Sequence, residues 1–245
     1  MAGRFDEALE ATRRVRELTR DLGGYHVGVA LMLLDDDART ERFLLAALER
    51  HPTAHRNHVL VAFLDLRRGQ TQAAIGRIRA ATAKAPENIE LLIARAEILT
   101  FAGAADAPEV VRALFARAPD GMLHNAPYPV KLLHAYHLHR SGSTADAGKI
   151  FDAVMTANRN SFLAGADWPM GHLQMGAVHA LRGETAAALD AVDRAYDAGW
   201  RDGRTLAIDP LFASVRPEPR FRQVLSRIEA GVAAMRARAD YTGLS

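Results

Sequence analysis

Histidine is the residue type in this chain that most readily suggests chemistry, because it ligates metals and transfers protons near neutral pH. His134 and His137 lie three residues apart on a predicted helix, with His139 nearby. A metal site needs three or four clustered ligands, usually including carboxylates or thiolates. The chain has no cysteine, and the acidic residue nearest to this group is Asp146. We therefore interpret the histidines as residues of helix faces and predict no metal site.

Other catalytic patterns are also missing. Gly23, Gly24 and Gly165 lack the spacing of phosphate-binding loops. The serines have no nucleophile-elbow sequence around them, and the run from Asp35 to Asp37 falls in a predicted turn, where water solvates carboxylates. The lack of cysteine excludes disulfide scaffolds and thiol nucleophiles. We predict no catalytic residue and no cofactor, and we expect that the chain is not an enzyme.

Composition favours closely packed helices. Of the 245 residues, 49% are apolar and only 7% aromatic, with abundant alanine, whereas a β-sandwich would favour β-branched and aromatic residues.

The 31 cationic residues nearly balance the 29 anionic ones and are spread along the chain, so we predict no nucleic-acid partner. The longest apolar run, residues 27–34, is far shorter than the about 20 residues of a membrane span, so we predict no membrane insertion. No targeting signal is visible, and we expect a cytoplasmic protein.

The elements that position these residues follow a repeat. Asp35, Gly69 and Gly103 are spaced by 34 residues, and equivalent positions recur at Gly142 and Gly183 after intervals of 39 and 41. Small residues recur at fixed offsets around these turn residues, among them Ala62, Ala74, Ala81, Ala135, Ala147, Gly176, Ala188 and Ala195. A glycine in the left-handed conformation ends a helix, and small residues let two helices cross closely. The pattern predicts consecutive helical pairs.

A helical pair of this length, with these small residues and a proline such as Pro86 after the second helix, resembles the tetratricopeptide repeat. The usual large aromatic residue near the start of each repeat is missing, with His58, Leu92, Lys131 and His172 in its place. The resemblance implies an all-α, right-handed α-solenoid. We assign residues 1–200 to an array of about five helical hairpins and residues 201–245 to a C-terminal capping segment and tail.

The two ends of the chain differ. Residues 3–9 resemble the turn and second helix of a repeat whose first helix is absent, so we expect this chain to be part of a longer polypeptide. At the other end, Asp209 and Glu218 each precede a proline and predict two helix starts. An apolar stripe follows, at Val224, Leu225, Ile228, Val232 and Met235. This tail resembles the closing segment of many bacterial tetratricopeptide proteins, and we expect it to cap the array.

The resemblance also implies a binding surface, because the first helices of successive tetratricopeptide repeats line a concave groove that receives a peptide or helix. On this sequence the groove residues would include Tyr25, Arg56, Phe63, Arg67, Glu97, Tyr136, His139 and Arg140. Aromatic and arginine residues are favoured at binding hot spots. The alternative for Phe63 and Tyr136 is packing between neighbouring repeats.

Two insertions between repeats offer a second candidate site. One contains His124 and Tyr128, and the other contains Trp168. They flank one repeat, so a small-ligand pocket could form between them, or Trp168 could fill a gap between unevenly spaced repeats. The function that we favour is a non-enzymatic scaffold or regulatory module for protein–protein interaction, binding a protein or peptide segment in the groove. The alternative is a small-ligand sensor domain of a larger bacterial regulator or signalling enzyme.

The repeat assignment places Ala74 where two helices cross. The substitution Ala74→Leu should overpack this crossing and lower the free energy of unfolding by about 1–3 kcal/mol. Chemical denaturation followed by circular dichroism would measure the loss, and an unchanged midpoint would show that the assigned repeat positions are wrong.

Overall fold

The computed structural model describes residue 4 and residues 6–11, 24–123 and 126–242. This part of the chain is all-α and contains no strand, as predicted. Five consecutive helical pairs make up most of it: α2 (Tyr25–Leu33) with α3 (Asp37–Arg50), α4 (His55–Arg67) with α5 (Thr71–Lys84), α6 (Ile89–Phe101) with α7 (Ala107–Phe115), α8 (Val130–Arg140) with α9 (Thr144–Leu163), and α10 (Pro169–Leu181) with α11 (Thr185–Asp197). Residues 6–11 are also helical, and Gly3 and Phe5 of the proposed incomplete repeat lie outside the described residues.

The turn inside each pair has the backbone conformation that the repeat predicts. Gly69, Gly103, Gly142 and Gly183 have φ values of 73°, 63°, 88° and 75° and follow the first helix of their pairs. Asp35 holds the same place in the first pair and is the non-glycine residue with positive φ, at 55°, in the described part of the chain. Each turn can therefore reverse the chain within a few residues, because the left-handed residue stops the helix.

Small residues lie where the helices of a pair cross. Ala62 on α4 and Ala74 on α5 are fully buried, and so are Ala135 on α8 and Ala147 on α9. At Gly28 of α2, an added Cβ would lie 2.5 Å from Leu44 Cδ2 on α3. Larger side chains at these places would push the helices apart, which is the physical reason for the periodic alanines and glycines.

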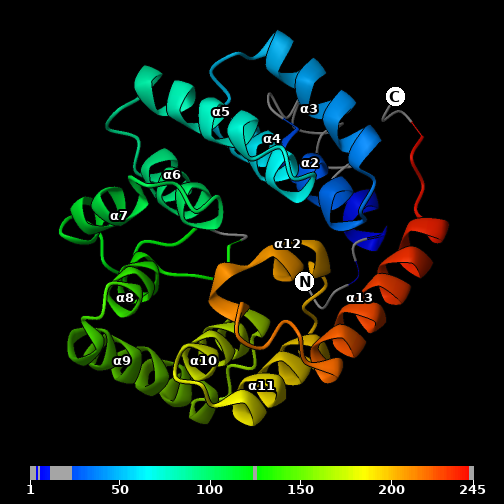
Figure 1. The fold of residues 1–245 in the computed structure, drawn as a ribbon. Coiled ribbons are helices and arrows are strands. Elements are labelled where there is room, and N and C mark those ends of the chain that lie inside the picture. Colours follow the sequence, from blue (N-terminus) through cyan, green and yellow to red (C-terminus); the bar gives the residue numbers. More distant parts are fainter. Residues whose placement is uncertain (1–3, 5, 12–23, 124–125, 243–245) are drawn as a thin grey trace.

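The pairs follow one another around an arc (Figure 1). The first helices, α2, α4, α6, α8 and α10, form the inner row, and the second helices form the outer row. After α11 the chain turns inward, and the short helix α12 (Gly203–Ile208) lies inside the arc, next to α4. The 3₁₀ turn η1 (Pro210–Phe212) then packs against α10.

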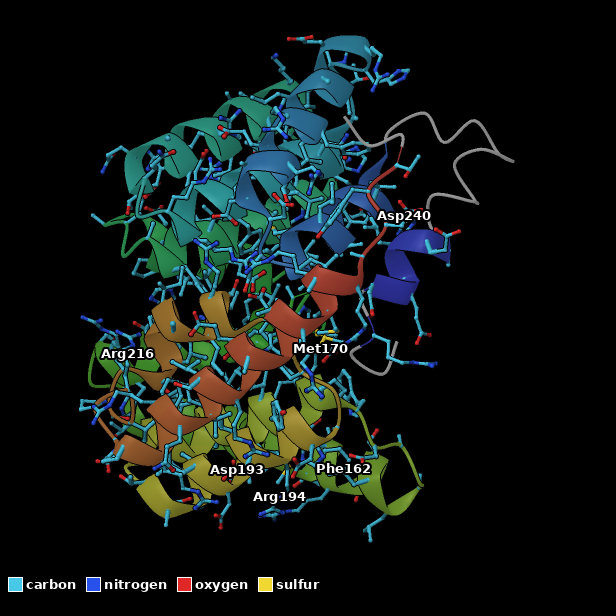
Figure 2. All side chains as sticks on the ribbon, turned by 90° about the vertical axis from the view of Figure 1, so that its right-hand side faces the viewer. Phe162, Met170, Asp193, Arg194, Arg216 and Asp240 are labelled. Atoms are coloured by element: carbon cyan, nitrogen blue, oxygen red, sulfur yellow. The ribbon has the colours of Figure 1, made fainter. Side chains whose placement is uncertain are left out.

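The last helix, α13 (Pro219–Arg238), spans the opening between the two ends of the arc (Figure 2). Both proline-linked starts predicted from the sequence are present, because Asp209 precedes η1 and Glu218 precedes α13. The predicted stripe is buried at Val224, Ile228, Val232 and Met235 and half-buried at Leu225.

Ion pairs extend the contacts of α13 to both ends of the arc. Arg220 and Arg227 each pair with Asp193 of α11, with N–O distances of 2.6 and 3.1 Å. Arg238 pairs with Asp6 at 3.0 Å, so the two ends of the described chain meet. Within the described residues, no helix has both the length and the apolar character that crossing a membrane requires.

Phe212 tests whether the returning C-terminal segment stabilises the whole fold. Its side chain is fully buried, its ring lies 3.3 Å from the Cβ position of Gly176 on α10, and its centroid is 5.9 Å from that of Phe221. Phe212→Ala should lower the free energy of unfolding by about 3–5 kcal/mol in a single transition. Urea denaturation followed by circular dichroism checks this. The control Leu163→Ala removes a side chain that is 86% exposed and should change little, and equal stabilities of the two variants would contradict the prediction.

Candidate functional site

A buried arginine holds the C-terminal segment against the inner row of helices. The guanidinium of Arg67 on α4 donates to the carbonyl oxygen of Met32 at 2.8 Å and to Asp35 Oδ1 at 2.6 Å. It also lies 3.2 Å from Asp202 Oδ1, and Asp202 caps α12 by accepting from the backbone N–H of Thr205. Burial raises the pKa of Asp35 to about 6, against the opposing effect of Arg67. Arg67 therefore fixes where α12 starts relative to α2 and α4.

A second buried contact fixes the other end of α12. The hydroxyl of Tyr128, in the loop before α8, donates to the carboxylate of Asp209, and both side chains are buried. Asp209 also accepts from the backbone N–H of Leu211 at 2.9 Å. Burial raises the pKa of Asp209 to about 7, although these hydrogen bonds act in the opposite direction. Burial, together with the charge of Asp209, raises the pKa of Tyr128 well above its usual range.

Between this segment and the inner helices lies a cavity of about 70 Å³, which we call the inner cavity. That volume holds several water-sized molecules or a small organic group. Its lining comes from α2, α4, α6, the loop before α8 and the C-terminal segment: Tyr25, Met32, His55, Arg56, Val59, Leu60, Phe63, Glu90, Glu97, Leu123, Ala126, Pro127, Trp200, Asp202 and Thr205. The residues of α4 recur at helical spacing, so one face of this helix supplies a whole wall.

The charged rim of the inner cavity is internally paired. Arg56 donates to both carboxylate oxygens of Glu90, at 2.8 and 2.5 Å, and His55 Nε2 lies 3.1 Å from Glu90 Oε2. The hydrogen bond from Arg56 is the main reason that the pKa of Glu90 falls to about 2. The Arg56 guanidinium also lies 5.4 Å from the ring centroid of Tyr25. These side chains are partly exposed, so the rim faces solvent.

Glu97 lies deeper and has the opposite environment. It is 1% exposed, and neither carboxylate oxygen has a hydrogen-bond partner among the described residues. Burial raises its pKa to about 8, with a further contribution from the charge of Asp209. A buried polar group without a partner costs free energy, so this carboxyl group marks the floor of the cavity as a place for an additional partner.

The structure divides the groove residues predicted from the sequence among several places. Tyr25, Arg56, Phe63 and Glu97 come together around the inner cavity. Arg67 lies beside them but is buried in its ion pairs with Asp35 and Asp202.

The remaining groove residues belong to α8. Tyr136 and Arg140 line a separate hollow between α8 and the α6–α7 pair, and Arg140 donates to the Tyr136 hydroxyl at 3.2 Å. The ring centroid of His139 lies 6.1 Å from that of Phe151 on α9. The predicted set is therefore distributed over more than one surface of the inner row.

The two insertions meet at a hollow that is separate from the inner cavity, because Asp120, Met122 and Pro129 of the first and Trp168 of the second line it. Tyr128 is not among its lining residues, since its side chain is buried against Asp209. His124 lies outside the described residues.

The histidines on α8 have local partners. His137 Nε2 lies 2.9 Å from the Thr100 hydroxyl, and the His134 ring stacks on Phe115 with centroids 4.4 Å apart. Burial lowers the pKa of both, to about 4 for His137. In the described ranges, no group of three or more histidine, aspartate or glutamate side chains has a geometry that could hold a metal ion.

Sequence reasoning missed the contribution of the C-terminal segment to the site. Trp200, Asp202 and Thr205 line the inner cavity, and Asp209 lies close enough to Glu97 to raise its pKa. Trp200 falls at the end of the predicted array, and Asp202 and Thr205 fall in the predicted capping segment, where the Asp209–Pro210 helix start is the local signal. A return of the chain over more than 100 residues to α4 and α6 leaves no periodic trace in the sequence.

The buried acid groups predict a pH dependence of stability. Glu97 has an ordinary pKa of 4.5 and a folded pKa of about 8. The folded chain therefore holds an extra proton between these values, and raising the pH through this window destabilises it. Glu97→Gln keeps a neutral group of the same shape, so its melting temperature should exceed that of the wild type by an amount that grows from about pH 5 to about pH 9. Differential scanning calorimetry measures this. The control Glu109→Gln, at an exposed position, should follow the wild type, and a pH-independent difference for Glu97→Gln would refute the assignment.

Comparisons of the chain with protein-family models, with curated proteins and with solved structures returned no match. The main features of the structure are an inner row of helices, a C-terminal segment seated on that row, and a small cavity between them with a paired charged rim and an unpaired buried carboxyl group.

Proposed function

We propose that this chain is a tetratricopeptide-like right-handed α-solenoid, capped by α13, that works as a non-enzymatic ligand-binding module. The five helical pairs, their left-handed turn residues and the alanines at the crossings support the repeat assignment. The burial of one face of α13 against the end of the array supports its role as a cap, since terminal repeats otherwise expose apolar surface.

The ligand of this module is a small molecule or a single protruding group that enters the inner cavity. The observation that carries this proposal is the convergence of Tyr25, Arg56, Phe63 and Glu97 with Trp200 around one cavity. Ligand sites are typically concave and mostly apolar, with a few placed polar groups that fix the orientation of the ligand. Because α12 lies within the arc, the space left at this point suits a compact ligand better than a peptide lying along the whole inner row.

The second candidate function is the binding of a protein or peptide segment along the inner row, as the tetratricopeptide resemblance implies. The observation that favours it is α12 itself. This short helix is a segment of chain seated against α4, with Arg67 paired to Asp202 at its start. A partner segment of the same chemistry would compete with α12 for this place.

A substitution that fills the inner cavity distinguishes the two proposed functions. Val59 lines it from the rigid helix α4, and Val59→Phe should occupy the space without changing the charged rim. We expect at least one compound from a library of cationic, anionic and neutral metabolites to raise the melting temperature of the wild type and not that of a Val59→Phe variant with unchanged circular dichroism. If stabilising compounds act equally on both proteins, or if none stabilises the wild type, the small-ligand function is wrong and binding of a protein segment becomes the preferred one.

A further inference from the structure

The chemistry at the floor of the inner cavity identifies the class of ligand, given the small-ligand function proposed above. Glu97 is a buried side chain with two acceptor oxygens, lines the cavity, and has no partner for either oxygen in the described part of the chain. Once it has lost its proton, this carboxyl group is purely an acceptor. A partner of the ionised form must therefore donate hydrogen bonds, and the strongest donors to a carboxylate carry positive charge.

The charges around the cavity leave this requirement unmet. Arg56 is engaged by Glu90 at the rim, and Arg67 is engaged by Asp35 and Asp202. The charge that acts on Glu97 is the negative charge of Asp209, and Tyr128 next to it adds no cation. Arg216 offsets part of the charge of Asp209 and donates to its backbone carbonyl oxygen at 2.6 Å. Among the described residues no cation acts on Glu97, and a positive ligand would supply one.

The apolar lining of the inner cavity favours an organic cation over a metal ion. Met32, Leu60, Phe63 and Leu123 make much of the lining apolar. The indole N–H of Trp200 already donates to the backbone carbonyl oxygen of Asp202 at 3.2 Å, so this side chain offers the cavity its ring surface. Divalent calcium or magnesium needs about six oxygen ligands, whereas one free carboxyl group among aromatic and aliphatic side chains suits an ammonium group on an alkyl chain.

We propose that the inner cavity binds a primary alkylammonium group, with its nitrogen donating to the Glu97 carboxylate and its carbon chain against Phe63 and Trp200. A free amine and the side chain of a lysine share this chemistry. In both cases the aliphatic stem replaces water on apolar walls, and the ammonium group gives the buried carboxylate the partner that it lacks.

Binding is coupled to the loss of a proton from Glu97. The groups that face this part of the cavity are Asp209 and Tyr128 behind Glu97, Asp202 on α12, and Glu90, Arg56 and His55 at the rim. Because burial raises the pKa of Glu97 to about 8, affinity should fall about tenfold for each pH unit below that value. The pH dependence distinguishes an ionic contact from simple apolar burial.

The test uses the full chain carrying Trp168→Phe, so that Trp200 is the remaining tryptophan of the two in the sequence. We expect n-butylammonium chloride to produce a saturable change in Trp200 fluorescence at about pH 8.5 that weakens as the pH falls towards about 6. The uncharged analogue n-butanol should have little effect. Glu97→Gln should weaken n-butylammonium binding by at least about tenfold, while the matched control Glu109→Gln should leave it unchanged.

The outcomes separate this inference from the function on which it rests. A response to Nα-acetyl-lysine amide that is lost on acetylation of its ε-amine supports a lysine side chain, and a response to n-butylammonium alone supports a free amine. Equal binding of n-butanol, or undiminished ammonium binding by Glu97→Gln, would overturn the inference. If anionic or neutral metabolites stabilise the wild type but not Val59→Phe, and n-butylammonium has no effect, this inference fails and the small-ligand function stands. If no compound binds, both fail.

Discussion

The buried guanidinium of Arg67 is the contact on which the inner face depends. A buried charge is tolerated only when it is paired and hydrogen-bonded, and Arg67 meets this condition with Asp35 from the first turn and Asp202 from the C-terminal segment. These carboxylates belong to parts of the chain that lie far apart in sequence. Removing either would leave Arg67 with incomplete compensation, which costs more than an exposed ion pair contributes. The position of α12, and with it one wall of the inner cavity, follows from this electrostatic requirement.

The two glutamates of α6 show how position alone gives one residue type two different properties. Glu90 and Glu97 are two helical turns apart and line the same cavity. Glu90, held by Arg56 and His55, has its pKa lowered to about 2 and is ionised under all ordinary conditions. Glu97, buried and near Asp209, has its pKa raised to about 8. Environments that separate the pKa values of two like groups are typical of functional sites, and here they distinguish an ionised, internally paired rim from a buried carboxyl group without a partner.

The helical pairs and much of the inner row could be predicted because they depend on local patterns. The left-handed residues at Gly69 and Gly142 and the buried alanines at 62 and 74 act within one pair, so a periodic sequence records them. Only some of the residues that line the inner cavity could be predicted. Tyr25, Arg56, Phe63 and Glu97 were implied by the resemblance to a repeat family whose first helices line a groove, whereas Trp200 and Asp202 reach them through a chain return that no spacing rule encodes. The repeat pattern alone also predicted an open groove, because nothing in it shows that α12 lies inside the arc.

The meeting of the chain ends also has a consequence for the order of folding. Arg238 and Asp6 are 232 residues apart in sequence and pair in space, so this contact has very high contact order, and such contacts form slowly. Helical pairs can fold one after another as the chain leaves the ribosome, since each contacts mainly its neighbours. The inner cavity cannot be complete until the segment containing Trp200 and Asp209 has been synthesised and has returned to α4 and α6. Ligand binding would therefore report that this segment has been synthesised and has returned to the inner helices.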